Sequence, residues 1–229
     1  MTEIDWDSVE ESLNREGWAV LQKLMPAHAC AAVAAMYEDE RRFRSTVVMA
    51  RHGFGRGAYK YFAYPLPDVL AALRTRLYPH LAPIANRWSE ALKSDVRYPA
   101  THAAYLKACH DAGQTRPTPL LLRYSTGDYN CLHQDRYGDE VFPLQVAVLL
   151  SRPGKDFSGG EFVLTEQRPR MQSRVMVVPL AQGDGVVFAV NQRPVTGSRG
   201  VYRVAMRHGV SALREGQRHT LGIIFHDAS

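Results

Sequence analysis

The stretch Tyr124-Ser-Thr-Gly-Asp-Tyr-Asn-Cys-Leu-His133-Gln134-Asp135 is the most informative part of this 229-residue chain. On a β-strand, residues two apart point to the same face, so His133 and Asp135 would point together while Gln134 points away. An imidazole and a carboxylate that face the same way are two of the ligands from which transition-metal sites are built. The stretch therefore predicts a strand that supplies two ligands of a metal site, with a third ligand from a distant part of the chain.

Three late histidines, His208, His219 and His226, are candidates for that third ligand. Arg218 follows His208 after ten residues, a spacing that allows a turn and a return strand into the same barrel. An arginine there suits a buried carboxylate, because the guanidinium stays charged and binds both oxygens. No basic residue follows His219 or His226. We therefore predict that His208 completes the set, which then has the form of the facial triad of non-haem Fe(II) oxygenases.

The pattern of apolar residues and turn formers changes at Pro119. After it, eight short apolar segments are separated by closely spaced Gly, Pro, Asn or Asp turn signals, a pattern typical of a double-sheet jelly roll. The expected strands are residues 120–125, 130–135, 144–151, 161–165, 175–179, 186–190, 201–209 and 219–226. Residues 192–200 are rich in turn formers and predict an exposed hairpin tip.

The first half of the chain predicts helices instead. Trp6, Val9 and Leu13 share one helical face that Gly17 would end, and residues 18–21 suit a short strand. Further helices are expected from Pro26 toward Phe43, from Pro67 through Leu77, around residues 84–92 and over residues 103–109. The expected fold class is mainly β with helices (α+β). In one compact domain, residues 1–117 form a helical N-terminal layer and residues 118–229 a double-stranded β-helix (jelly roll) core.

Three glycines within five residues interrupt the helical layer and exclude regular structure there. The surrounding segment, residues 51–64, holds no acidic residue and mixes cations with aromatic rings. This composition is used to hold phosphates and stack bases. It predicts a mobile flap in which Arg56 and Lys60 contact phosphates and Tyr59 or Tyr61 stacks on a base. The alternative is that these aromatic residues pack beneath the helices.

Charge is distributed unevenly along the chain. The whole sequence has 28 basic and 23 acidic residues, and residues 1–44 hold five basic and nine acidic ones, so residues 45–229 hold 23 and 14. A basic region of this kind attracts polyanions or acidic substrates. An arginine-rich genome composition would produce the same excess, since 23 of the 28 basic residues are arginine.

Several classes of protein are excluded by composition. No run of eighteen apolar residues predicts a membrane span, and the acidic N-terminus lacks the apolar region of a secretory leader. The three cysteines, Cys30, Cys109 and Cys131, are odd in number and lack zinc-site spacing. They indicate free thiols in a reducing cytoplasm.

Residues 118–227 as a set resemble the 2-oxoglutarate/Fe(II)-dependent dioxygenase superfamily. His133, Asp135 and His208 match the iron ligands of its HxD…H pattern. The resemblance implies a double-stranded β-helix that binds Fe(II) through these three residues. It also implies an enzyme that uses 2-oxoglutarate and O2 to hydroxylate a C–H bond of its substrate, with release of succinate and CO2.

The same resemblance assigns the cosubstrate site. Arg218 matches the basic residue that binds the far carboxylate of 2-oxoglutarate, and Tyr124, nine residues before His133, matches a tyrosine that contacts the cosubstrate. Thr220 would point inward beside Arg218.

Two subfamilies compete within this resemblance. The His-x-Asp strand is similar to the AlkB group, which oxidatively dealkylates nucleic-acid bases, although Leu122 and Ile224 replace an asparagine and an arginine of that group. The C-terminal end is more similar to prolyl 4-hydroxylase-like enzymes. The chain as a whole resembles a bacterial oxygenase family proposed to act in nucleic acid repair. The implied substrate is alkylated DNA or RNA, with single strands preferred. The alternatives are a protein or amino-acid hydroxylase and a non-catalytic sensor of 2-oxoglutarate and iron.

Overall fold

A computed structural model of the chain describes residues 3–135, 138–198 and 200–229. Its helices are α1 (Trp6–Glu16), α2 (Ala27–Ala35), α3 (Asp68–Ala91) and α4 (His102–Asp111), with short 3-10 turns η1 (Met36–Glu38), η2 (Glu40–Arg42) and η3 (Met49–His52). The strands of the first half are β1 (Trp18–Leu21), β2 (Phe43–Val48), β3 (Gly55–Arg56) and β4 (Ala58–Phe62). Those of the second half are β5 (Leu120–Ser125), β6 (Tyr129–His133), β7 (Leu144–Leu149), β8 (Phe157–Gly159), β9 (Phe162–Gln167), β10 (Arg174–Val178), β11 (Gly185–Ala189), β12 (Gln192–Gly197), β13 (Gly200–Val210) and β14 (Leu213–Ile223).

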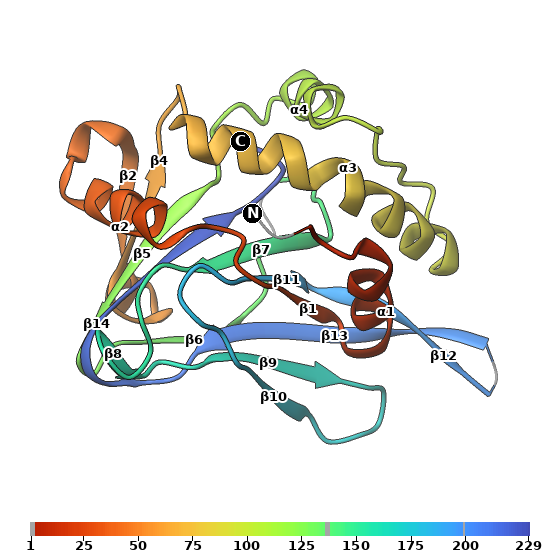
Figure 1. Ribbon diagram of the computed structural model, residues 1–229. Coiled ribbons are helices and arrows are strands. Elements are labelled where there is room, and N and C mark those ends of the chain that lie inside the picture. The colour runs from red at the N-terminus through yellow and green to blue at the C-terminus, as the bar shows by residue number, and fades with distance from the viewer. Residues whose placement is uncertain (1–2, 136–137, 199) are drawn as a thin grey trace.

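The strands form two antiparallel sheets, and α3 and α4 lie outside the larger one (Figure 1). The larger sheet has the order β1-β11-β7-β14-β5-β4-β2, with β8 attached to β14. The smaller has the order β10-β9-β13-β6-β3, with β12 attached to β13. The jelly-roll prediction is confirmed, and each of the eight expected strands has a counterpart.

Burial follows the position of each strand in these layers. All residues of β7 and β11 are buried, because the helices cover one face of the larger sheet and the smaller sheet faces the other. Along β14, Arg218, Thr220 and Gly222 share the inner face, since alternate residues of a strand point the same way. The inner faces of the two sheets therefore enclose the region where polar side chains can meet.

The N-terminal layer is not purely helical, which corrects the expectation for residues 43–62. β4 pairs with β2 on one side and β5 on the other, so this segment extends the larger sheet. β1 pairs with β11 at the opposite edge, as the apolar stretch 18–21 indicated. The helix expected from Pro26 toward Phe43 ends at Ala35, because the chain then turns through η1 and η2 into β2.

Helix α3 joins two segments that were expected to be separate helices. It runs through Pro79 and Pro83 without ending. Proline removes one helical hydrogen bond, but the buried stripe from Leu70 to Trp88 is continuous and holds both halves against the sheet. No helix within the described residues combines the length and apolar character needed to cross a bilayer.

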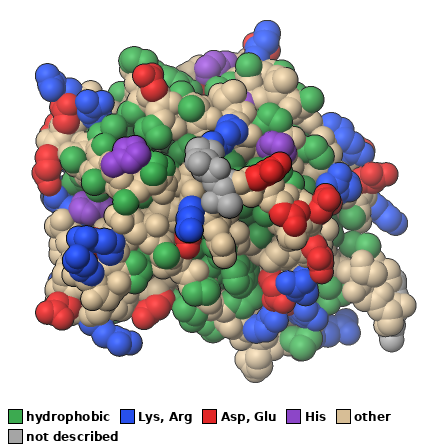
Figure 2. All heavy atoms as spheres, viewed as in Figure 1, with side chains coloured by type: hydrophobic (Ala, Val, Ile, Leu, Met, Phe, Trp, Pro, Cys, Tyr) green, Lys and Arg blue, Asp and Glu red, His purple; other side chains and the backbone are tan. Residues whose placement is uncertain are grey.

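Many basic residues are paired with acids of the N-terminal segment. Glu38 binds Arg123, Glu40 binds Lys60, Glu16 binds Arg174 and Glu10 binds Arg87. A further pair, Glu166 with Arg193, is almost fully buried. Figure 2 shows acidic and basic side chains interspersed over the face that it presents. The excess of positive charge in residues 45–229 is thus partly neutralised in the folded chain.

Candidate active site

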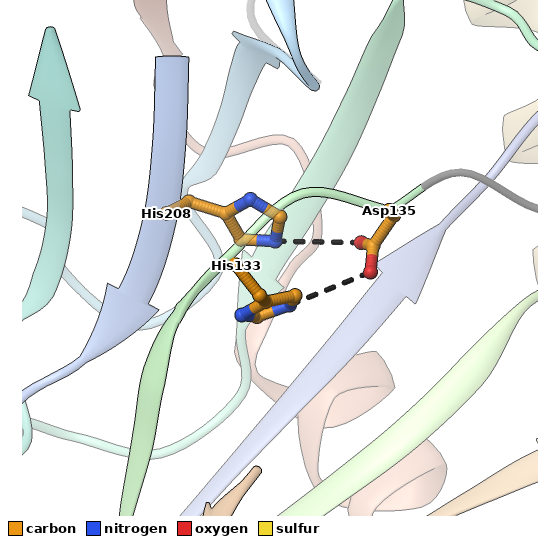
Figure 3. A group of neighbouring side chains, drawn as sticks. All are labelled: His133, Asp135 and His208. Carbon is orange, nitrogen blue, oxygen red and sulfur yellow. Dashed lines mark ion pairs between the residues drawn. The ribbon is translucent and has the colours of Figure 1, made fainter. Parts of the chain in front are cut away.

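His133, Asp135 and His208 converge between the two sheets (Figure 3). His133 ends β6 and pairs directly with His208 on β13, which brings their ring centroids to 4.2 Å. Asp135 follows β6 and points back, so that its Oδ1 lies 3.4 Å from His133 Nε2 and its Oδ2 3.4 Å from His208 Nε2. Two imidazole nitrogens and a carboxylate suit a divalent transition metal. The group can therefore hold one metal ion.

The three side chains strongly influence one another's protonation. Burial raises the pKa of Asp135, but hydrogen bonds from His133 and His208 outweigh it and hold that pKa well below its ordinary value. Burial lowers the pKa of His133, which Asp135 nevertheless raises overall, whereas burial and the neighbouring His133 lower the pKa of His208. A metal ion would replace the protons shared within the group.

The imidazole of His133 is held in one tautomer. Its Nδ1 lies 2.7 Å from the carbonyl oxygen of Cys131, which can only accept, so Nδ1–H is the donor and Nε2 is left for a metal. His208 is 7% exposed, and its Nδ1 has no partner among the described residues. Both side chains thus present Nε2 to Asp135.

A cavity of about 350 Å³ opens beside the three residues. At one end of it Arg218 lies opposite Tyr124 in the strand register, and the guanidinium carbon is 5.6 Å from the tyrosine ring centroid. Arg218 Nη1 lies 2.5 Å from Thr220 Oγ1, to which it donates a hydrogen bond. The structure thus places Tyr124, Arg218 and Thr220 together in the same cavity as His133; their contact with a cosubstrate stays a prediction.

The Arg218 guanidinium has no carboxylate in ion-pair contact among the described residues, and Glu161 acts on it only at longer range. Arg218 is 2% exposed, forms no ion pair within the described chain, and its Nε has no hydrogen-bond partner there. Burial lowers its pKa to about 10, so it is still charged at neutral pH. A buried unpaired cation is costly. The cavity is therefore suited to an anionic ligand at this end.

Residues 51–64, which were expected to form a flap, are largely built into the sheets. Only Tyr59 of the two tyrosines lines the cavity. Tyr61 is 8% exposed and packs edge-on against Tyr59, with ring centroids 5.4 Å apart. A ring so buried cannot stack on an entering base, so for Tyr61 the packing alternative fits the structure.

Lys60 and Arg56, which were predicted to contact phosphates, differ in their surroundings. Lys60 is 5% exposed, donates to the carbonyl oxygen of Tyr37 at 2.8 Å and pairs with Glu40. It faces away from the cavity, and the prediction that it holds a phosphate does not fit this position. Arg56 is exposed on β3 and forms no ion pair with any residue that the structure describes.

Two apolar residues at the mouth of the cavity were not predicted from the sequence. Phe54 and Leu132 both line it, yet are 47% and 46% exposed. The backbone holds Phe54 in place, because its carbonyl accepts a hydrogen bond from Cys131 N at 2.9 Å and its N–H donates to Met49 O. The sequence does indicate the position of Phe54, because this aromatic residue lies between two glycines in an irregular segment, where an exposed ring is expected.

A glycine sets the spacing of the two histidines. A Cβ added to Gly209 would lie 2.6 Å from the carbonyl oxygen of Asn130, so β13 can approach β6 only without a side chain there. Gly209→Ala is expected to push the strands apart, separate His208 from His133 and weaken metal binding roughly tenfold or more. Titration with Fe(II) or Co(II) measures this.

Gly222→Ala is the matched control for that experiment. A Cβ at Gly222 would meet only the movable side chain of Leu120, at 3.1 Å. Equal metal affinity in Gly209→Ala, Gly222→Ala and the unmodified chain would contradict the positioning role of Gly209.

Comparison with known proteins identifies the family. Residues 57–228 match the family model Oxygenase-NA, described as an oxygenase catalysing oxidative methylation of damaged DNA. An uncharacterised protein of Mycobacterium tuberculosis, found in strains CDC 1551 and H37Rv, is 47% identical over 192 residues, which cover 82% of each chain.

Solved structures of low identity share the fold. An oxidoreductase of the 2OG-Fe(II) oxygenase family from Burkholderia pseudomallei has a TM-score of 0.56 at 16% identity, with 100% of this chain and 94% of that chain covered. A prolyl-4-hydroxylase from Pseudomonas putida has a TM-score of 0.52 at 15% identity, with 95% and 96% covered. The chain therefore belongs to the Oxygenase-NA family of oxygenases, and its fold is that of the 2OG-Fe(II) oxygenases.

Proposed function

We propose that this oxygenase is Fe(II)- and 2-oxoglutarate-dependent and oxidatively dealkylates modified bases of DNA or RNA. One observation carries the cofactor assignment. A three-residue metal-binding group and a buried, unpaired Arg218 line the same cavity. When bound, Fe(II), 2-oxoglutarate and O2 supply the oxidation of a substrate C–H bond, with release of succinate and CO2.

The residues of the cavity would divide this task. His133, Asp135 and His208 would hold the metal, and Arg218 would bind the far carboxylate of 2-oxoglutarate. Burial raises the pKa of Tyr124 to about 12, so its hydroxyl stays protonated and can donate to a bound carboxylate.

Apolar side chains make up the rest of the wall. Leu122, Val146, Phe162 and Phe188 line the cavity and limit the access of water to the metal. The cavity volume lies in the range of small-molecule sites. The donor set, the unpaired cation and the apolar wall together fit an Fe(II) ion with an acidic cosubstrate.

A nucleic acid substrate is supported by the family description and by the mouth of the cavity. The family model names damaged DNA. At the mouth, the exposed ring of Phe54 lies between Arg51 and Arg56 in the sequence, and neither arginine forms an ion pair with a described residue. An enzyme that oxidises a base must draw it out of a duplex or act on single strands. We therefore propose a preference for single strands.

A screen of succinate release tests the proposal. The purified protein is incubated with Fe(II), 2-oxoglutarate and methylated oligonucleotides, peptides or amino acids. Stimulation by methylated single strands supports dealkylation of nucleic acid. Stimulation by peptides or amino acids alone would favour the hydroxylase alternative, to which the fold of the Pseudomonas putida prolyl-4-hydroxylase lends some support. No succinate under any condition would leave only a sensor.

Phe54→Ala is expected to weaken binding of single-stranded oligonucleotides. A base stacked on an exposed ring contributes about 1–3 kcal/mol, which corresponds to a rise in Kd of roughly 5- to 150-fold. Fluorescence anisotropy at fixed ionic strength measures it. Val175→Ala, which truncates a 62% exposed apolar residue on β10, is the control. Equal affinities of the two variants would exclude stacking on Phe54.

A further inference from the structure

Gln145 is a buried polar residue that belongs neither to the metal-binding group nor to the part of the cavity around Arg218. It lies on β7 and is 4% exposed. In the strand register it pairs with Phe188, two residues along from the pair of Ala147 with Gly222. Because Gly222 is on the inner face of the larger sheet, the side chain of Gln145 points into the cavity, which it also lines.

The amide nitrogen of Gln145 is unpaired within the described residues. Its Nε2 is buried and forms no hydrogen bond with the residues that the structure describes. By contrast, the amide of Gln134 near the same site donates to the carbonyl oxygens of Asn191 and Met206 at 2.9 and 2.8 Å. Leaving such a group without a partner destabilises the folded chain. A ligand in the cavity would supply the missing hydrogen bonds.

The position of Gln145 separates it from the cosubstrate end. The last residue pair between β7 and β14 is Val146 with Ile223, and Gln145 lies one residue beyond it. In the same register Arg218 falls opposite position 151, which is six residues from Gln145. At about 3.3 Å per residue this is roughly 20 Å of strand. A five-carbon acid held on Arg218 does not span that distance.

Gln145 instead lies at the His208 end of the cavity. Its register partner Phe188 packs on His208, with ring centroids 4.6 Å apart, and on Phe162 at 5.2 Å. Two aromatic rings and one amide with both a donor and an acceptor therefore surround this part of the cavity. Enzymes that act on extruded bases use hydrogen bonds to the polar edge of the base, and the amide of Gln145 can make such bonds.

We propose that Gln145 determines substrate specificity by reading the polar edge of a base that has entered the cavity. The amide would donate to one atom of that edge and accept from its neighbour, as in paired contacts with the N6 and N7 atoms of adenine. This inference rests on the proposed function, since it requires a nucleic acid substrate.

Gln145→Leu tests the assignment, because leucine is similar in size but cannot form hydrogen bonds. Binding is measured anaerobically, with Fe(II) and 2-oxoglutarate bound, to single-stranded oligonucleotides that each carry one methylated adenine, cytosine, guanine or thymine. The Kd of the preferred oligonucleotide, and its KM in separate assays with O2, should rise roughly tenfold or more. The KM for the cosubstrate and the substrate-independent release of succinate should not change. Gln217→Leu, an exposed position on β14, is the matched control.

Gln145→Glu provides a second variant that keeps the shape of the side chain. A carboxylate only accepts hydrogen bonds, so the order of preference among the four methylated bases should change rather than all affinities fall equally. A uniform loss across the four, or none, would contradict edge recognition.

The failure of this inference is distinguishable from failure of the proposed function. If the unmodified chain oxidises oligonucleotides and Gln145→Leu matches Gln217→Leu, Gln145 has no such role while the function stands. A raised KM for the cosubstrate in Gln145→Leu would assign the amide to the cosubstrate and overturn the inference. If the unmodified chain ignores oligonucleotides but releases succinate, the nucleic acid part of the proposal and this inference both fail.

Discussion

Asp135→Ala should abolish metal-dependent turnover, with a loss in kcat/KM on the order of 10³-fold or more, while the chain remains folded. The substitution removes the one anionic ligand and leaves two imidazoles, and metal-supplied stabilisation of several kcal/mol is lost with it. The fold should persist because Asp135 packs between His133 and His208 and supports no strand pairing. Succinate release, Fe(II) titration and thermal unfolding measure the three effects.

Asp139→Ala is the control, since this exposed carboxylate lies four residues further along the chain. His133→Ala should behave as Asp135→Ala does. Iron-dependent activity that persists in both of these variants would overturn the assignment of the metal ligands.

Arg218→Ala should weaken 2-oxoglutarate binding on the order of 30-fold or more and leave Fe(II) binding almost unchanged. The substitution leaves the far carboxylate of the cosubstrate among apolar residues, and loss of a buried charge pair costs about 2–5 kcal/mol. Arg218→Lys should recover part of the affinity, because an ammonium restores the charge but not the paired geometry of a guanidinium. Steady-state kinetics, which give the KM for the cosubstrate, and isothermal titration measure the change.

Arg214→Ala is the matched control on the same strand, where the side chain is exposed. An unchanged KM in Arg218→Ala would assign the cosubstrate to another basic residue. Arg207 and Arg214, the nearest alternatives in sequence, are both exposed.

The parts of the fold that sequence predicted well are those fixed by local patterns. Residues 120–125 were expected as a strand and form β5 with those bounds, because apolar runs between turn formers define strands locally. His133 and Asp135 meet at one site as predicted, although β6 ends at His133 and Asp135 lies just beyond the strand. His208 was predicted as the distant ligand because its spacing to Arg218 allowed a turn and a return strand, and the structure places it beside His133; its role as a ligand stays a prediction.

The parts that sequence did not predict depend on contacts between distant segments. β4 is a strand because β2 and β5 pair with it on both sides, and the glycines beside it conceal that pattern. Composition identified Lys60 as a cation and Tyr61 as an aromatic residue, but it did not show toward which face of the sheet each side chain would point. Gln145 lies in a strand that is buried at every position, so no alternation marked its side as the inner one.

The pairing of β1 at the edge of the larger sheet also determines when, during synthesis of the chain, that sheet can be completed. Trp18 lies opposite Phe188 and Leu21 opposite Gly185. β1 is therefore synthesised long before β11, the strand with which it pairs. Pairings of such long sequence separation slow folding and leave unpaired strand edges exposed in the meantime. His208 emerges from the ribosome after β11, so the metal-binding group can form only once the partner of β1 has been made. A nascent chain halted before residue 185 therefore has neither a closed sheet nor the complete three-residue group.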